Sequence, residues 1–304
     1  MASPGALRAA AVNVDVDSLY LYYRIHGLDE ARATDVVWER GVVRFAELFA
    51  ELGVAATFFV VAQDLDRPGP RRVAEALAQA GHELGSHSHT HPYDLTRLGR
   101  ATMADELARA EDAISAVSGR PVRGFRAPGY TVTRELLELL AERGYAYDSS
   151  LFPAPPYYLA KAAYMAWLRV RGRKSQSILD RPSIMWQRRT PHRRHGLLEI
   201  PVTVLPWLRL HVIGTSLLQL GERGYGVIAP WLRRVDLVNL ELHGIDLCDL
   251  AEDGIDPALR TQPDLRVDLA TKLALFRRVF TDLRDGWGVD TLESLSGRLA
   301  ASAA

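Results

Sequence analysis

The feature that most constrains the fold is an uninterrupted apolar run, Val54–Val61, which consists mainly of β-branched and aromatic residues. Apolar runs without alternating polar residues are typical of strands that are buried on both faces of a parallel sheet. The run lies between two segments with helical spacing of apolar residues, Val36–Leu52 and Pro70–Ala80, and a glycine follows each as a C-cap. This part of the chain is therefore predicted to form a strand with a helix on either side.

The same alternation of strand and helix patterns continues along most of the chain. We expect further strands at Ala10–Val16, Glu83–Ser86, Gly124–Ala127, Tyr145–Ser149, Leu197–Leu205 and Leu237–Leu242, and further helices at Ala101–Val117, Thr133–Glu142, Tyr157–Val170 and Asp264–Leu283. Strands that alternate with helices indicate an α/β fold with a parallel sheet. We interpret residues 1–304 as a single domain. Parallel barrels carry their active site at the carboxyl ends of the strands, and polar residues cluster at the ends of these strands.

The overall composition excludes several classes of protein. Lys+Arg and Asp+Glu are both 37, so the net charge provides no attraction to nucleic acid. Cys248 is the only cysteine, so no disulfide can form within the chain. There is no apolar stretch of about 18 residues that could span a membrane, and residues 1–11 do not resemble a signal peptide. We therefore expect a cytoplasmic protein, associated at most with the inner face of the membrane.

Two aspartates, Asp15 and Asp17, lie two residues apart at the end of the first expected strand. Residues at this spacing point to the same face of a strand. Carboxylates that follow an apolar strand are costly to bury unless they are solvated, paired or bound to a cation. A turn in which both side chains face water is the alternative interpretation.

A histidine cluster follows the strand at Glu83–Ser86, within the sequence GHELGSHSHTHPYDL. His87, His89 and His91 are three imidazoles within five residues, and divalent metals favour imidazole combined with carboxylate. One helical turn would bring the rings of His87 and His91 to the same side and would direct His89 elsewhere. A lone histidine is usually structural or exposed, but three so close together favour a metal site.

Three further polar residues lie at the ends of expected strands. Arg126 lies in FRAPGY, Asp148 in YDSSLFP and His243 in LELHGID. Each has a simpler explanation, such as a solvated arginine in a turn or a packed core histidine. Their shared place at strand ends favours a function in one site.

These five segments, in this order, resemble the NodB-homology polysaccharide deacetylases, which form carbohydrate esterase family 4. The match runs from about residue 10 to residue 160 and again from 197 to 247, and GHELGSHSHTH is its most specific part. The resemblance implies a distorted (β/α) barrel of about seven parallel strands. The first motif departs from the family pattern, because Val16 separates the two aspartates (DVDS). In this respect the motif is similar to that of deformylases that act on lipid-linked aminoarabinose.

The resemblance also implies a hydrolase with a divalent metal, most often zinc, that removes an N-acyl group, acetyl or formyl, from an amino sugar or a glycan precursor. It implies that the metal ligands are Asp17, His87 and His91. It further implies that Asp15 is the catalytic base, that Arg126 holds this base, that His243 is the general acid, and that Asp148 supports the acid.

Two alternatives remain open for the function. One is a deformylase or another amidohydrolase that acts on a lipid-linked sugar or a small amide, which the split DVDS motif favours. The other is a catalytically inactive barrel that only binds carbohydrate. The presence of all the implied site residues counts against an inactive barrel, since fold alone does not determine function.

Residues 154–196 interrupt the alternation, and we interpret them as an insertion between barrel strands. Aromatic residues come first, and Asp180 is the only acidic residue. The basic residues are Lys161, Arg169, Arg171, Arg173, Lys174, Arg181, Arg188, Arg189, Arg193 and Arg194. Aromatic residues beside arginines suit a membrane surface with anionic lipid, so residues 157–194 are a candidate for peripheral membrane contact. A solvated flap with aromatic residues packed on the barrel is the alternative.

Overall fold

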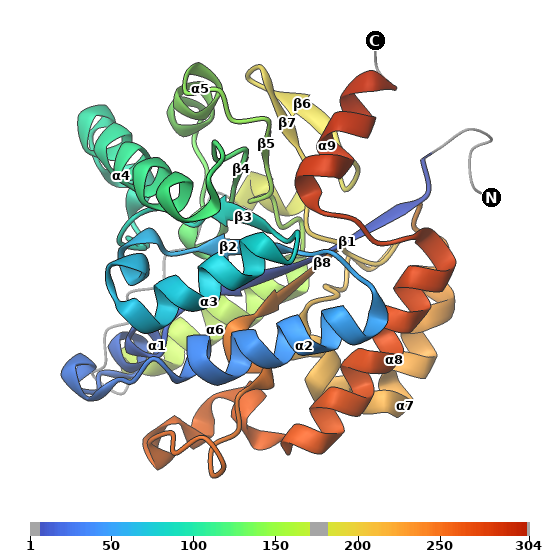
Figure 1. The fold of residues 1–304 in the computed structure, drawn as a ribbon. Helices are drawn as coiled ribbons and strands as arrows, with labels where there is room; N and C mark the ends of the chain where they lie inside the picture. The colour runs from blue at the N-terminus through green and yellow to red at the C-terminus, as the bar shows by residue number, and fades with distance from the viewer. Residues whose placement is uncertain (1–6, 171–181, 303–304) are drawn as a thin grey trace.

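The computed structural model describes residues 7–170 and 182–302, and its centre is a sheet that curls into a distorted barrel (Figure 1). The strand order is β6-β7-β5-β4-β3-β2-β1-β8, and within the described residues only β6 is antiparallel to its neighbour. The other seven strands are parallel, which confirms the predicted α/β barrel. The strands are β1 (Ala9–Val16), β2 (Thr57–Val60), β3 (Glu83–Ser86), β4 (Gly124–Phe125), β5 (Tyr147–Asp148), β6 (His192–Arg194), β7 (Leu197–Glu199) and β8 (Leu237–His243).

Helices surround this sheet, and α2 and α3 lie side by side on its outer face (Figure 1). The helices are α1 (Leu19–His26), α2 (Val43–Leu52), α3 (Pro68–Gln79), α4 (Arg100–Ser118), α5 (Arg134–Glu142), α6 (Pro155–Val170), α7 (Gly214–Leu232), α8 (Leu269–Trp287) and α9 (Leu292–Ala301). Of the described helices, none is both long and apolar enough to cross a bilayer.

Three of these helices, α1, α7 and α9, are not predicted by the sequence patterns. In α7 the reason is its content of Gly221, Gly224, Gly226 and Pro230, since glycine and proline are the weakest helix formers. The helix expected at Asp264–Leu283 begins later, at Leu269, because the carboxylate of Asp268 accepts the Thr271 amide as an N-cap.

The barrel closes between β7 and β8 through an irregular segment. The strand expected at Leu197–Leu205 ends at Glu199, and Pro201 has no amide hydrogen to donate to a ladder. Beyond it, the Thr203 amide donates to the Asn239 carbonyl at 3.0 Å, and the Asn239 amide donates to Thr203 Oγ1 at 2.7 Å. The Asn239 side chain also donates to the carbonyls of Ile200 and Pro201. Side chains therefore complete the closure that the backbone ladder leaves open.

The barrel interior is mainly apolar at one end, where Thr57 and Glu83 are buried polar exceptions, and polar at the other. Ala9, Phe59 and Tyr147 form an apolar cluster with Leu292 and Leu295 of α9, which closes the amino-terminal end. Towards the carboxyl ends of the strands, the inward-facing residues are polar and buried. They include Asn13, Asp15, Arg126, Ser149, Asn239 and Glu241, which hydrogen-bond to one another or to neighbouring groups. The polar layer forms the floor of the site described below.

The helix expected at Val36–Leu52 begins with a π-helical segment, Val37–Val42, that continues into α2. Gly41 lies in this segment against the turn that follows β8. A Cβ atom built on Gly41 would lie 2.0 Å from the Gly244 carbonyl oxygen and 2.9 Å from Cys248 Sγ. Only glycine allows this close approach.

We predict that Gly41→Ala lowers the free energy of unfolding by roughly 1–3 kcal/mol, because the added methyl group overpacks a buried backbone contact. Gly286→Ala in α8 is the matched control, since a Cβ there meets no atom within 4 Å. We expect this control to raise the free energy of unfolding by up to about 1 kcal/mol. Urea denaturation measures both, and equal values for the two variants would contradict the packing argument.

Candidate metal and catalytic site

The side chains of Asp17, His87 and His91 converge at the carboxyl ends of β1 and β3. Asp17 Oδ1 lies 3.5 Å from His87 Nε2 and 3.4 Å from His91 Nε2, and all three residues are buried. Ligands about 2.1 Å from a tetrahedral zinc ion lie roughly 3.4 Å from each other. Asp17 Oδ1 has no hydrogen-bond partner among the described residues. This donor set and its spacing fit a divalent cation.

The loop after β3 brings the two imidazoles together without the helical turn that we expected. Ser88 and His91 have positive φ angles of 64° and 57°, and the Ser88 hydroxyl accepts the His91 amide at 3.1 Å. The carboxylate of Glu106 accepts the amides of His89 and Thr90. The prediction that the rings of His87 and His91 lie on the same side was therefore right, but they are brought together by a loop and not by a helical turn. His89 does not join Asp17, His87 and His91, and its ring is directed elsewhere as expected.

Both imidazoles are neutral, and a hydrogen bond fixes the tautomer of His87. His87 Nδ1 lies 2.7 Å from the Arg126 carbonyl oxygen. Since a carbonyl can only accept, Nδ1 carries the proton and Nε2 keeps its lone pair towards Asp17. Burial lowers the pKa of His87 and lowers that of His91 to about 3, so both rings are neutral at pH 7. Burial also raises the pKa of Asp17, as expected for a carboxylate that needs a cation.

Asp15 lies deeper in the barrel and is paired with Arg126. Arg126 Nη1 donates to Asp15 Oδ1 at 2.8 Å and also donates to the side-chain oxygen of Asn13. Its Nε and Nη2 donate to the carbonyl and the hydroxyl of Ser149, each at 2.8 Å. Burial alone would raise the pKa of Asp15, but the charges of Arg126 and His243 and the hydrogen bond from Arg126 outweigh it and hold this pKa below its usual value. Asp15 is therefore ionised at neutral pH.

His243 lies opposite Asp15 in the pairing of β8 with β1. Its Nδ1 is 3.5 Å from Glu241 Oε1, and the Tyr130 hydroxyl donates to the same carboxylate oxygen. The His243 amide donates to Asp246 Oδ2 at 2.9 Å. Burial lowers the pKa of His243, but Glu241, together with the nearby aspartates, outweighs burial and raises this pKa to about 9. The ring is therefore protonated at neutral pH.

The sequence predictions did not include Glu241, which lies beside His243, or Tyr130, which hydrogen-bonds to Glu241. A signal for Glu241 was present in LELH, because residues two apart on a strand share a face and Glu241 must therefore point inwards with His243. No comparable signal marks Tyr130, which a 3₁₀ turn at Pro128–Tyr130 carries to β8 from across the barrel.

Asp148 is not brought to His243, where we predicted it. Tyr147 and Ser149 both point into the barrel, because their side chains bond to Glu83 and Arg126. Strand alternation therefore turns Asp148 outwards. There its carboxylate accepts the Ser150 hydroxyl and hydrogen-bonds with Glu199. The geometry gives Asp148 a structural partner and leaves Glu241 as the carboxylate beside the histidine.

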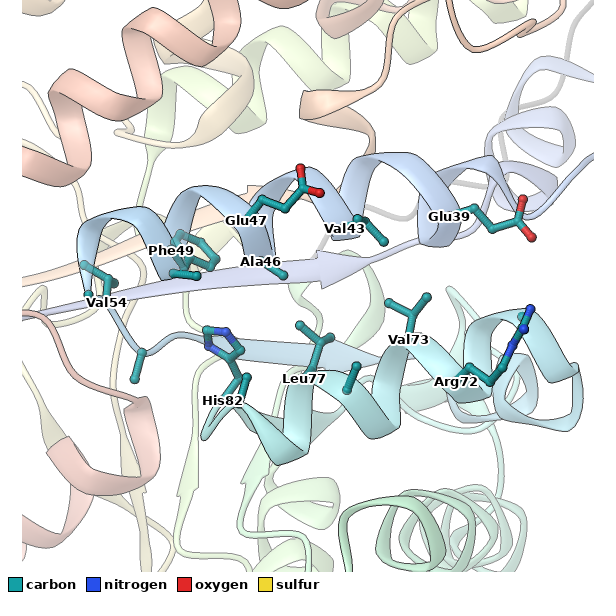
Figure 2. A pocket seen from close by; sticks show the side chains of 16 residues that line it. Glu39, Val43, Ala46, Glu47, Phe49, Val54, Arg72, Val73, Leu77 and His82 are labelled. Atoms are coloured by element: carbon teal, nitrogen blue, oxygen red, sulfur yellow. The ribbon is translucent and has the colours of Figure 1, made fainter.

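A cavity of about 550 Å³ opens over the predicted metal ligands, Asp15 and His243. Tyr157 and Lys161 of α6 line one wall, so the segment predicted as an insertion contributes to the site. His211 lines it from the segment that follows β7. A second hollow, between α2 and α3, is lined by Phe49, Leu77 and His82 among others and contains none of the predicted site residues (Figure 2).

The part of the chain that carries His87, His91 and Arg126 resembles a known family of proteins. Residues 33–147 match the polysaccharide deacetylase family model. This match covers less than half of the chain, and it confirms the predicted resemblance to the polysaccharide deacetylase family.

Individual relatives are similar over parts of their sequence. A peptidoglycan deacetylase of Helicobacter pylori is 25% identical over 156 residues, which cover 49% of this chain and 52% of that protein. A peptidoglycan deacetylase-like protein of Gibberella zeae is 29% identical over 123 residues, covering 39% of this chain and 36% of that protein. The chain thus matches about half or less of the length of these relatives.

A solved structure from Mycobacterium smegmatis, whose name assigns it provisionally to the polysaccharide deacetylases, has a TM-score of 0.63 at 20% identity. The alignment covers 100% of this chain and 94% of that one. At this identity the likeness establishes the shared fold, and the chemistry has to be argued from the residues of this chain.

We predict that the buried Asp148–Glu199 pair makes stability depend on pH. Burial, together with the charge of Asp148, raises the pKa of Glu199 well above 4.5, so the folded state retains a proton that the unfolded state releases. The stabilisation from this proton is complete below pH 4.5 and is lost as the pH rises through the folded value. Glutamine does not titrate, so Glu199→Gln should not lose stability in this way. The free energy of unfolding of Glu199→Gln should therefore rise relative to that of the wild type as the pH increases. Urea denaturation over a pH series measures this difference, and a difference independent of pH would contradict the shared proton.

Proposed function

We propose that this protein is a metal-dependent hydrolase that removes an N-acyl group, acetyl or formyl, from an amino sugar or a glycan precursor. The observation that carries the proposal is the convergence of Asp17, His87 and His91 in one cavity with an ionised Asp15 and a protonated His243. Two imidazoles and one carboxylate leave open positions on a metal, as catalytic zinc sites do, and zinc is the ion that we propose. The peptidoglycan deacetylase relatives support a glycan substrate.

When bound, the metal would lower the pKa of a water molecule and polarise the carbonyl group of the amide. Asp15 is ionised and lies beside the proposed metal ligands, so it is placed to accept a proton from the nucleophile that attacks the amide. Arg126 keeps Asp15 ionised and in place, because three of its nitrogens are held by Asp15, Asn13 and Ser149. A base that could rotate or be protonated would lose this role.

His243 donates its proton to the amide nitrogen, which lets the C–N bond break and the amine leave. The carboxylate of Glu241 keeps the ring charged, and the Tyr130 hydroxyl fixes that carboxylate in turn. The products are an amine and acetate or formate. Proton transfer by a positioned acid or base contributes roughly 10²–10⁴-fold to such a rate.

The cavity supports a substrate of limited size, since α6 encloses it on one side. A deformylase or amidohydrolase that acts on a lipid-linked sugar or a small amide therefore remains the second candidate. An inactive carbohydrate-binding barrel would not need an ionised base and a protonated acid beside three metal ligands. A cytoplasmic location, and one domain over residues 1–304, remain part of the proposal.

The expected membrane contact through residues 157–194 also remains a proposal. In α6, Tyr157 and Lys161 line the cavity, which supports a role in binding substrate. Arg171, Arg173, Lys174 and Arg181 lie outside the described residues.

We predict that Asp17→Ala and His87→Ala each lose bound metal and amidase activity together, because each removes one of only three ligands. Metal analysis of the purified variants and an assay for released acetate or formate measure the two quantities. Asp15→Asn is the matched control: it should retain the metal but lose roughly 10²–10⁴-fold in kcat. Full activity in Asp15→Asn would refute the role of Asp15 as the base.

We also predict that Glu241→Gln moves the alkaline limb of the pH–rate profile to lower pH. The acid must be protonated to act, so activity is lost as the pH rises through the pKa of His243, which is about 9. Glu241 is the strongest of the charges that raise this pKa, and glutamine carries no charge. Plots of kcat/KM against pH measure the shift, and Tyr130→Phe should move the limb less. An unmoved limb in Glu241→Gln would show that Glu241 does not act on His243.

A further inference from the structure

We propose that a surface outside the catalytic cavity docks the protein on an anionic lipid bilayer. The surface, which we name the tryptophan–arginine patch, consists of Trp186, Arg189, Trp207–Arg209, Arg233 and Arg234. The inference goes beyond the proposed hydrolase activity. It also differs from the contact predicted along residues 157–194, because most of the patch lies further along the chain.

The first observation is the exposure of large apolar side chains in the patch. Trp207 is 83% exposed, and Leu208 and Trp186 are each 71% exposed. Tryptophan and leucine are usually buried, because water contact with so much apolar surface is unfavourable. Several such side chains that lie together on a surface mark a site of interaction.

The second observation is that the backbone holds these side chains outwards. Residues 204–211 form a ribbon, in which Val204 pairs with His211 and the Leu205 amide donates to the Leu210 carbonyl at 2.7 Å. At its tip, Trp207 and Arg209 have φ angles of 71° and 49°, a conformation that non-glycine residues rarely adopt. The fold thus maintains energetically unfavourable φ angles at the tip, and this conformation exposes Trp207 and Leu208 to solvent.

The third observation is that Arg209 fixes the tip to the neighbouring segment. Its Nη1 donates to the carbonyls of Met185 and Gln187 at 3.0 and 2.9 Å, and its guanidinium lies 5.7 Å from the centre of the Trp186 ring. Trp186 and the tip are therefore parts of one preorganised surface. Less conformational entropy is lost when such a surface binds.

The charge of the patch identifies the partner. Arg189, Arg209, Arg233 and Arg234 line one groove of about 920 Å³ together with Trp207, and Asp236 is the only acidic residue among its described lining. Within the described part of the chain, none of these four arginines forms an ion pair with a carboxylate. Burial and the charge of Arg189 lower the pKa of Arg209, as expected where positive charges are crowded. An anionic surface would relieve this crowding.

An anionic bilayer provides both things that the patch lacks. Anionic phospholipid headgroups can pair with the arginines, and the interfacial region of the bilayer accepts tryptophan and leucine side chains. A soluble polyanion could pair with the arginines but would leave Trp207 and Leu208 in water. The apolar tip therefore favours a bilayer over a nucleic acid or a sulfated glycan.

The ribbon also connects the patch to the catalytic cavity. Trp207 and Leu208 form its tip, whereas His211 at its base lines the cavity. Docking through the tip would bring the cavity close to the headgroups. The proposed activity and the docking can nevertheless fail separately, because vesicle binding needs neither the metal nor turnover.

The experiment is vesicle flotation of the full chain, with tryptophan fluorescence as a second measurement. We expect binding to vesicles of phosphatidylcholine mixed with phosphatidylglycerol, a blue shift of the tryptophan emission, and weaker binding at high salt. Vesicles of phosphatidylcholine alone should bind much less. No binding to the anionic vesicles at low salt would overturn the proposal.

Variants locate the contact. The double variant Trp207→Ser, Leu208→Ser should lose at least about tenfold in vesicle affinity, and Arg189→Ala combined with Arg234→Ala should lose the preference for anionic lipid. Arg72→Ala combined with Arg134→Ala is the matched charge control, since both arginines are exposed on other helices, and it should bind like the wild type. Asp17→Ala should also bind like the wild type, whatever its activity.

Two results would overturn the proposal even if vesicles bind. Leu159 on α6 is 66% exposed and lies in the segment 157–194, so loss of binding in Leu159→Ser but not in the tip variant would assign the contact to α6. Binding to heparin that matches vesicle binding and is unaffected by the tip variant would identify a polyanion site instead. Circular dichroism establishes that each variant is folded.

Discussion

The polar interior of this barrel depends on one buried guanidinium. Arg126 is fully buried, and an isolated charge in such a place would cost several kcal/mol. Its hydrogen bonds reach Asp15 and Asn13 on β1 and Ser149 after β5, so one side chain links strands on both sides of its own strand β4. Removal of any partner would leave a buried charge or a buried donor without compensation. The same bonds that stabilise the interior therefore hold Asp15 beside the proposed metal ligands.

The sequence predicts much of the fold because apolar patterning is a local property. The continuous run around Phe58 and the residues with helical spacing on either side of it identify β2, α2 and α3 with small errors in their ends. The errors occur where tertiary contacts override the pattern. Asp268 delays the start of α8, Pro201 ends the strand that begins at Leu197, and glycines conceal α7.

The positions of some site residues are predicted correctly and those of others are not, and strand alternation explains which. Asp15 and His243 lie inside the barrel, because each is two residues after a buried polar side chain, Asn13 or Glu241, that also faces inwards. Asp148 has the same kind of position in the sequence, but Tyr147 and Ser149 take the two inward positions on either side of it. Sequence position near a strand end was thus insufficient, since the direction of the side chain decides whether it reaches the site. Tyr130 could not be found at all, because only the curvature of the barrel brings it to β8.

The irregular closure between residues 200–204 and β8 divides the site into two parts with different constraints. The proposed base and the proposed metal ligands are anchored to β1 and β3, whose regular ladders tolerate little change in length. The ribbon that follows the closure is joined to β8 through Asn239 and Thr203 and by one bridge between Ile213 and Glu241, so its length can change without disturbing a ladder. Relatives with this architecture can therefore keep one hydrolytic centre while the opposite wall diverges. Changes in substrate range would be concentrated at the irregular closure between residues 200–204 and β8.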